Sequence, residues 1–183
     1  FGPEGQCTRN PFSEHRPQGD CVGHLPTQAR HGLVWFWPGG AAAADPALIP
    51  DFRFLEGLDV WRRHSHFNGD YELLTDNLLD LSHVDYLHRD TFATNGTHAE
   101  SVQKVFDGEG HTLWTTWRIP RVRRFPVLDG HFGPDEPIDQ LLELRWDPPA
   151  SMMLRISWLA AGVDDADVRV SLPTPHIITP EGP

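Results

Sequence analysis

The chain of 183 residues has few cysteines, a minority of basic residues and no long apolar run, and each shortage excludes a class of protein. Two cysteines are too few for a disulfide framework, which favours a reducing, cytoplasmic setting. The 15 basic side chains face 26 acidic ones, and the net charge of −11 opposes binding to nucleic acid or to an anionic membrane. No apolar run approaches the roughly 20 residues that span a bilayer, and no signal peptide is recognisable.

The length suits one domain, or one domain with a part of another. A hydrophobic fraction of 39% and seven tryptophans are enough for a core. The sequence begins at Phe1 rather than at a methionine, and it ends in the turn-like stretch TPEGP. We therefore expect an internal fragment of a longer protein.

The hydrophobic pattern changes its period near residue 100. Before that point, residues 31–37 have strand character, residues 38–52 are typical of a linker, and residues 60–69 can form a strand. Asp70 is a suitable N-cap for the helix that follows. The apolar residues of this helix recur at steps of three and four, at Tyr71, Leu74, Leu78 and Leu81.

After residue 100 the apolar residues alternate with polar ones, which predicts strands. Turn-like stretches such as DGEG, DPPA and GVDDAD separate them. Consecutive strands without helices between them imply an antiparallel sheet, so a sheet with one helix laid on it predicts an α+β architecture. The predicted strands are residues 101–106, 111–120, 139–146, 151–160 and 167–173.

The stretch DNLLDLSHVDYLH, residues 76–88, places polar side chains within a leucine-rich helical pattern. Asp80 and His83 face the same way on a helix, whereas His83 and His88 lie about 140° apart around it. The two imidazoles can reach one ion only if the helix ends or bulges near them. Two histidines and a carboxylate are the facial ligand set of Fe(II). With 11 histidines in the chain, the spacing alone also fits hydrogen-bonded or surface histidines.

The longer stretch DNLLDLSHVDYLHRDTFA resembles the iron-binding helix of Rieske non-heme iron oxygenases, in the branch similar to vanillate O-demethylase oxygenase components. FGPEGQCTRNP and ARHGLVWFWPG resemble the end of the Rieske domain, and ADPALIPDF resembles the crossover that follows it. LRWDPPASMMLRI and HIITPE resemble strands of the catalytic sheet. The resemblance implies that residues 1–40 are the remnant of an all-β Rieske [2Fe-2S] domain and that residues 41–183 are a partial catalytic domain of the α+β helix-grip kind.

The resemblance also implies roles for four residues of this motif. His83 and His88 would be two of three ligands of a mononuclear Fe(II). Asp80 would be a catalytic bridging acid that accepts a hydrogen bond from a ligand histidine and contacts a cluster-ligand histidine of a neighbouring subunit. Asn77 would be a catalytic residue lining the site, although a plain helix-surface asparagine fits it as well.

The same resemblance predicts that other ligands lie outside the chain. A Rieske cluster requires C-x-H and C-x-x-H. CVGH provides Cys21 and His24, but its upstream partner CTR places Arg9 where a histidine is needed, and arginine does not bind metal. We therefore interpret Cys7 and Cys21 as free of the cluster, whose ligands would precede Phe1. The third iron ligand, an aspartate in this family, would follow HIITPE.

As a member of this family, the parent protein would be an oxygenase that hydroxylates or O-demethylates a small aromatic compound with O2. A reductase or ferredoxin would donate electrons through the [2Fe-2S] cluster, and the assembly would be a homotrimer. The fragment alone would be inactive. Its pocket candidates, which ordinary core packing would also explain, are Trp114, Trp117, Leu144 and Met153.

Two other functions stay open at this stage. The helix-grip architecture also occurs in non-catalytic modules that bind an aromatic or lipid-like ligand. A zinc hydrolase using His83 and His88 is chemically reasonable but lacks a recognisable general-base motif. The arginine-rich stretch RIPRVRR, residues 118–124, could guide an acidic substrate, or it is a solvated charged patch.

Overall fold

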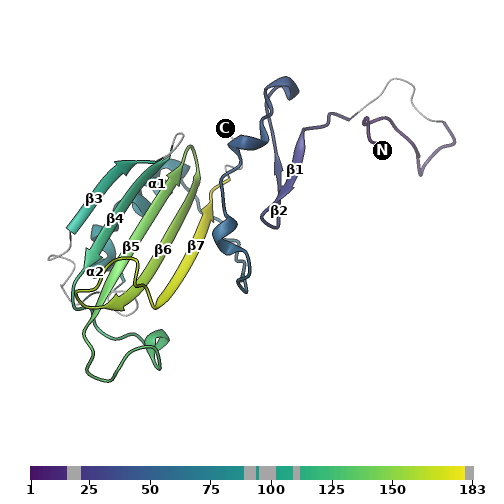
Figure 1. The fold of residues 1–183 in the computed structure, drawn as a ribbon. Coiled ribbons are helices and arrows are strands. Elements are labelled where there is room, and N and C mark those ends of the chain that lie inside the picture. Colours follow the sequence, from purple (N-terminus) through teal and green to yellow (C-terminus); the bar gives the residue numbers. More distant parts are fainter. Residues whose placement is uncertain (16–21, 89–93, 95–101, 109–111, 180–183) are drawn as a thin grey trace. The chain divides into compact units, whose positions relative to one another are not determined.

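The computed structural model describes residues 1–15, 22–88, 94, 102–108 and 112–179. It separates into two compact units, Phe1–Glu56 and Gly57–Pro183. The expected division into residues 1–40 and 41–183, with the first part assigned to a Rieske domain, stays a prediction. Figure 1 shows the elements of both units in order along the chain.

The first unit contains a two-stranded antiparallel hairpin of β1 (Thr27–Arg30) and β2 (Leu33–Phe36). Its turn has two residues with positive φ, His31 at 56° and Gly32 at 72°, as a tight two-residue hairpin turn requires. The predicted linker contains short 3-10 turns, namely η1 (Ala41–Ala43), η2 (Pro46–Leu48) and η3 (Arg53–Leu55).

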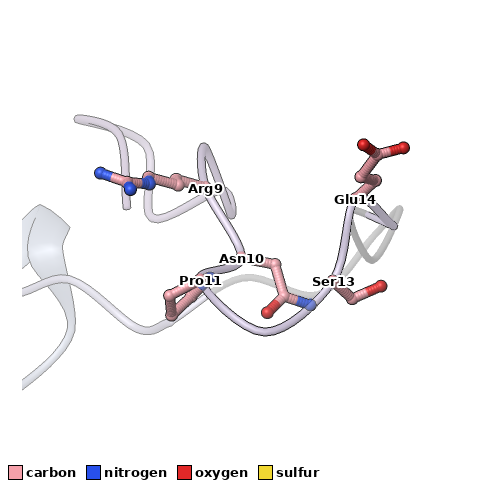
Figure 2. A pocket seen from close by; sticks show the side chains of 5 residues that line it. All are labelled: Arg9, Asn10, Pro11, Ser13 and Glu14. Carbon is pink, nitrogen blue, oxygen red and sulfur yellow. The ribbon is translucent and has the colours of Figure 1, made fainter.

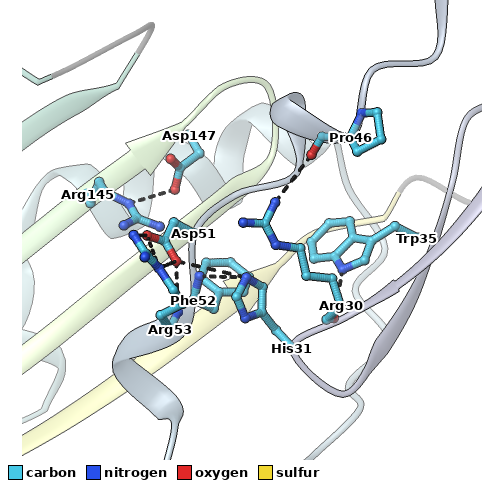
Figure 3. A network of polar contacts seen from close by, with 9 residues as sticks. All are labelled: Arg30, His31, Trp35, Pro46, Asp51, Phe52, Arg53, Arg145 and Asp147. Atoms are coloured by element: carbon cyan, nitrogen blue, oxygen red, sulfur yellow. Dashed lines mark hydrogen bonds and ion pairs between the residues drawn. The ribbon is translucent and has the colours of Figure 1, made fainter.

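Aromatic and polar contacts hold the hairpin against the segment that follows it (Figure 3). Phe52 is buried, and its ring lies 6.2 Å from that of Trp35 and 5.9 Å from that of His31. The Phe52 backbone N–H donates to His31 Nε2 over 3.2 Å. Nearby, the hydrogen bond from Arg53 lowers the pKa of Asp51 to about 2. These contacts give the first unit a defined local structure without a large core.

The second unit is built on a five-stranded antiparallel sheet in the order β3-β4-β5-β6-β7 (Figure 1). Each strand pairs with the next one along the chain, as the period of two and the tight turns predicted. The α+β expectation is confirmed. The strand bounds are β3 (Val102–Asp107), β4 (Leu113–Ile119), β5 (Ile138–Asp147), β6 (Ser151–Ala160) and β7 (Val170–Ile177).

The helical segment lies on one face of this sheet (Figure 1). It consists of α1 (Tyr71–Leu79), η4 (Leu81–His83) and α2 (Val84–Leu87). Leu81 is buried in the same hydrophobic cluster as Leu142 of β5 and Trp158 of β6, and Val84 packs against that cluster. The loop between β4 and β5 completes the cluster with Val122, Phe125, Leu128 and Phe132.

The opposite face of the sheet carries charged pairs, because side chains alternate along each strand. Glu143 and Arg155 are cross-strand partners, 3.4 Å apart. On the same face, Arg145 Nε donates to Asp147 over 2.9 Å, and both residues are labelled in Figure 3. The sheet therefore has one apolar, helix-bearing face and one face of ion pairs, which also carries the buried side chains of Leu141, Met153 and Leu159.

The arginine-rich stretch, residues 118–124, makes ion pairs and hydrogen bonds with the sheet and the following loop, so it is more than a solvated patch. Arg118 pairs with the buried carboxylate of Asp139 over 2.9 Å and also with Asp165. The backbone N–H of Arg121 donates to Asp139 as well, over 3.0 Å. Arg124 donates to the carbonyl of Phe132 over 3.3 Å. The Arg121 bond fastens the loop between β4 and β5 to the sheet, and the Arg124 bond lies within that loop.

The strand expected at residues 60–69 is absent, and that prediction was wrong. The segment is described, but it pairs with no strand among the described residues. Its apolar residues are exposed, with Trp61 82% accessible, so their spacing reflects no buried face. His66 instead bonds the side chain of Asn68 over 2.8 Å.

Candidate metal-binding site

The predicted helix begins where the sequence indicated. The Asp70 carboxylate accepts a hydrogen bond from the Glu72 N–H over 3.0 Å, so Asp70 is the N-cap of α1. The helix ends at Leu79, because Asp80 has extended backbone angles of −97° and 96°. The carboxylate of Asp80 then accepts from the Ser82 N–H over 2.9 Å and starts the next turn. One aspartate therefore ends a helix and redirects the chain into η4.

His83 and His88 lie at the two ends of α2. His83 is the last residue of η4, and His88 follows the end of α2 with backbone angles of −114° and 33°. Because the helix ends at Leu87, the two rings need not diverge by the angle of a regular helix. Their centroids are 5.5 Å apart, in an edge-to-face arrangement with an interplanar angle of 61°.

This separation fits two ligands of one ion. Imidazoles that bind one metal through bonds of about 2.1 Å have ring centroids roughly 4.6 to 5.6 Å apart for angles of about 90° to 120° at the metal. His83 is half-buried and His88 is exposed, so the pair is open to an incoming ion. The geometry is compatible with metal binding by both histidines.

Asp80 contacts His83 through its backbone. The Nδ1 atom of His83 lies 2.6 Å from the Asp80 carbonyl oxygen, which can only accept a hydrogen bond. Nδ1 therefore carries the proton, and the lone pair of the neutral ring is on Nε2, the atom available to a metal. The resemblance implied that the acid accepts a bond from a ligand histidine, and here the acceptor atom is the carbonyl oxygen.

The structure does not bring the remaining predicted site residue, Asn77, or a third metal ligand into contact with the histidine pair among the described residues. Asn77 is an exposed residue of α1, one turn before Asp80, and its role at the site stays a prediction. Among the described residues, no group of three His, Cys, Asp or Glu side chains is arranged to hold a metal ion. The described part of the chain thus offers two histidines and not a complete ligand set.

The pocket candidates divide between the two faces of the sheet. Trp117 is opposite Leu142 in the strand register and belongs to the helix-bearing face, where it packs against the core. Leu144 shares that face but is fully buried, which makes it a core residue. Trp114 and Met153 are both opposite Arg145 and so lie on the face of ion pairs. Of the four, only Trp117 combines the right face with partial exposure.

Sequence reasoning missed a contact between Asp85 and Thr94. The Asp85 carboxylate accepts from the Thr94 N–H over 2.5 Å and from its hydroxyl group over 2.8 Å. Thr94 is 1% exposed. An acid between the two histidines is visible in the sequence, but its partner lies nine residues further on, and no local pattern indicates that the chain returns there.

Outside this region, the described residues offer little chemistry. A surface hollow of about 440 Å³ in the first unit is lined by Arg9, Asn10, Pro11, Ser13 and Glu14 (Figure 2). These residues belong to one loop, which the bonds of Asn10 to Phe12 and His15 shape. Cys7 is half-buried with its sulfur near the Arg9 carbonyl, and Cys21 lies outside the described residues. None of the described helices is long and apolar enough to cross a membrane.

The second unit thus has the α+β architecture of a ring-hydroxylating oxygenase catalytic domain, a sheet gripped by a helix that carries two neighbouring imidazoles. The chain belongs to the family of the vanillate O-demethylase oxygenase C-terminal domain, whose family model matches residues 67–182.

Known relatives agree with this family. The dicamba O-demethylase oxygenase component of Stenotrophomonas maltophilia is 35% identical over 187 residues, which cover 99% of this chain and 54% of the relative. The vanillate O-demethylase oxygenase subunit of Pseudomonas sp. (strain ATCC 19151) is 32% identical over 178 residues, covering 88% and 52%. The chain therefore spans about half the length of the curated relatives it matches.

Solved structures show the same likeness. Dicamba monooxygenase bound to dicamba superposes with a TM-score of 0.82 at 30% identity, covering 97% of this chain and 52% of that one. Dicamba monooxygenase with non-heme iron and dicamba gives a TM-score of 0.69 at 30% identity, covering 97% and 50%. The fold seen here is that of these oxygenase chains.

Proposed function

We propose that this chain is part of an oxygenase component that hydroxylates or O-demethylates an aromatic compound with O2 at a mononuclear Fe(II). The family and the names of the relatives support the reaction class, since those relatives are O-demethylase oxygenase components. Electrons would come from a reductase or ferredoxin, and the protein would work in the cytoplasm as a homotrimer. The observation that carries the proposal is the pair of imidazoles, with ring centroids 5.5 Å apart, on the helix-bearing face of the sheet.

The donor set present here suits iron. Neutral imidazole is a good ligand for Fe(II), and the two histidines, completed by the aspartate expected after HIITPE, would leave coordination positions open for O2. His83 would bind through Nε2, since its Nδ1 proton is directed to the Asp80 carbonyl. His88 would supply the second nitrogen. A bound Fe(II) would supply the oxygen activation that attack on an aromatic ring or a methoxy group requires.

The residues around the pair have supporting tasks. The carbonyl of Asp80 orients the His83 ring and holds its proton, as partners of metal-ligating histidines commonly do. The half-buried Trp117 and the apolar face of β4 to β6 would provide an apolar wall for an aromatic substrate and exclude water from it. Asn77 is proposed to line the site near the metal, and Asp80 is proposed to bridge to a cluster-ligand histidine of a neighbouring subunit.

The [2Fe-2S] cluster of such systems does not fit the cysteine that the structure describes. The Cys7 sulfur lies 3.7 Å from the Arg9 carbonyl, and arginine stands where the cluster motif needs histidine. No step of the proposal therefore passes through a cluster held by Cys7.

The alternative is a non-catalytic module that binds an aromatic or lipid-like ligand on the same apolar face. It needs no metal, whereas the oxygenase needs iron at the two histidines. Iron retention therefore separates the two functions.

The test uses the full chain loaded anaerobically with Fe(II), freed of excess metal and assayed for iron. Because the described part of the chain supplies only two of the three expected ligands, the wild type is expected to retain Fe(II) weakly but measurably, and His83→Ala and His88→Ala are each expected to retain clearly less. His66→Ala is the matched control, because His66 is an exposed histidine bonded to Asn68. Iron retention unchanged in both site variants would contradict the proposal, and stoichiometric zinc in preference to iron would favour a hydrolytic site.

A further inference from the structure

The segment between the two histidines is too short to hold its own shape. Helix α2 has four residues. Isolated helices of this length are unstable in water, because ordering the backbone of the first turn costs more free energy than its hydrogen bond contributes. Its side chains Tyr86 and Leu87 are 74% and 72% exposed, so they anchor it little. Contacts outside the helix must therefore determine where His88 lies relative to His83.

Two residues of α2 make such contacts. Val84 packs against the hydrophobic cluster of the sheet and fixes the His83 end of the helix. Asp85 is half-buried, and both of its carboxylate oxygens lie 2.8 Å from the Thr94 hydroxyl. One of them also accepts the Thr94 backbone N–H. Hydrogen bonds to a carboxylate are among the stronger ones in proteins.

His88 lies between Asp85 and Thr94 in the sequence, so their hydrogen bonds link the chain on its two sides. His88 follows Asp85 by three residues and precedes Thr94 by six. Its backbone angles of −114° and 33° are no longer those of an α-helix. Its N–H still bonds the Val84 carbonyl over 3.1 Å, which ties it to the same short helix. Thr94 is buried, so its bonds with the Asp85 carboxylate are shielded from water.

We infer that Asp85 is a positioning residue for the metal pair, which holds α2 against Thr94 and thereby sets the distance between the His83 and His88 rings. This inference rests on the proposed function, because it concerns the same two histidines. Asp85 is not expected to touch the metal. It acts through the backbone that carries His88.

The experiment measures Co(II) affinity and the Co(II) d–d absorption spectrum of the full chain, with the metal-free melting temperature recorded for every variant. In Asp85→Asn the affinity is expected to fall about 10- to 100-fold, the usual loss when a residue supporting metal ligands is removed, and the spectrum is expected to change. Thr94→Val, which removes the hydroxyl donor, should shift both in the same direction. Thr94→Ser keeps the hydroxyl and is expected to keep the wild-type spectrum.

The matched control is Asp164→Asn. The Asp164 carboxylate accepts a backbone N–H two residues on, from Ala166, in the turn between β6 and β7. Its loss is expected to leave affinity and spectrum unchanged. Should Asp85→Asn fail to fold, Thr94→Val decides.

Wild-type affinity and spectrum in a folded Asp85→Asn, or in Thr94→Val if that variant must decide, would overturn the positioning role and leave the proposed function standing. Equal losses in Asp164→Asn would overturn it too, since they would indicate general destabilisation. A wild-type chain that binds no Co(II), or binds it without need of His83 and His88, would overturn the proposed function and this inference with it.

Discussion

At the scale of single residues, Asp80 has three tasks at one position. Its extended backbone ends α1, its carboxylate caps the following turn, and its carbonyl accepts a hydrogen bond from His83 Nδ1–H. The last of these tasks is performed by a backbone atom, so a change of side chain acts on it only through the shape of the chain. The capping task belongs to the side chain and is open to direct substitution.

His176 provides a pH-dependent test at this scale. It lies on the helix-bearing face opposite Met152, and burial lowers the pKa of its imidazole below the usual value of 6.5. The unfolded chain therefore takes up a proton at a higher pH than the folded chain. The stability contributed by the neutral ring is fully present above about pH 6.5 and is lost as the pH falls towards the lowered pKa.

His176→Gln is expected to flatten the decline in the free energy of unfolding between about pH 6.5 and pH 5. Urea unfolding at a series of pH values measures this slope. An unchanged slope in His176→Gln would show that His176 does not titrate differently in the folded chain.

Residue-level predictions from the sequence succeeded where a local motif carried the information. Asp70 was recognisable as an N-cap because capping depends on neighbours only. His83 and His88 could be paired through their spacing and the family resemblance, but their 5.5 Å separation depends on where the helix ends. The contact of Asp85 with Thr94 was not predictable, because it depends on the path of the chain between them.

At the scale of elements, the break between α1 and η4 redirects the chain before both histidines, and the end of α2 at Leu87 takes His88 off the regular helix. Leu81, directly after the break, is 4% exposed and packs into the cluster of the sheet. It continues the apolar stripe of α1 even though the helix has ended, so the stripe predicted burial across the break. Packing of this one leucine joins the histidine-bearing segment to the sheet.

Leu81→Ala is expected to destabilise the protein by about 2 to 5 kcal/mol, the usual cost of a cavity left by a buried leucine. Leu73 lies on the same segment but is 58% exposed, and Leu73→Ala is expected to cost less than about 0.5 kcal/mol. Denaturant unfolding followed by tryptophan fluorescence measures both changes. Equal effects at the two positions would mean that η4 is not packed on the sheet as described.

The strands were predictable to differing degrees. β6 has the predicted bounds of residues 151–160, because alternation and turns mark both of its ends. β7 begins at Val170 rather than at residue 167, since the Asp167 N–H bonds the Asp164 carbonyl and prolongs the turn. It also continues through Pro173 and Pro175, which an edge strand tolerates because it needs fewer N–H donors. Among the described strands β7 is at the edge, and the sequence pattern does not carry that information.

At the scale of the whole molecule, the chain consists of two units that differ in construction. The second unit has a five-stranded sheet with its own hydrophobic cluster, whereas the first relies on a hairpin and a few aromatic contacts. The sequence also indicated two parts, and its division into domains of residues 1–40 and 41–183 stays a prediction. Substrate and partners belong to this scale, and they are proposals because the chain spans about half of its relatives.

A chain shortened to residues 57–183 is expected to keep the sheet and to unfold in one cooperative transition, because the cluster that holds it belongs to this unit. Far-ultraviolet circular dichroism and thermal unfolding test this expectation. Loss of the β-sheet signal in the shortened chain would show that the second unit depends on the first for its folding.

The central claim is that His83 and His88 bind one Fe(II) together. X-ray diffraction at the iron absorption edge, on crystals grown anaerobically with Fe(II), tests it most directly. The account predicts one anomalous peak within about 2.2 Å of the Nε2 atom of His83 and equally close to a ring nitrogen of His88. Iron bound elsewhere, or bound to one of the two rings with the other turned away, would contradict it.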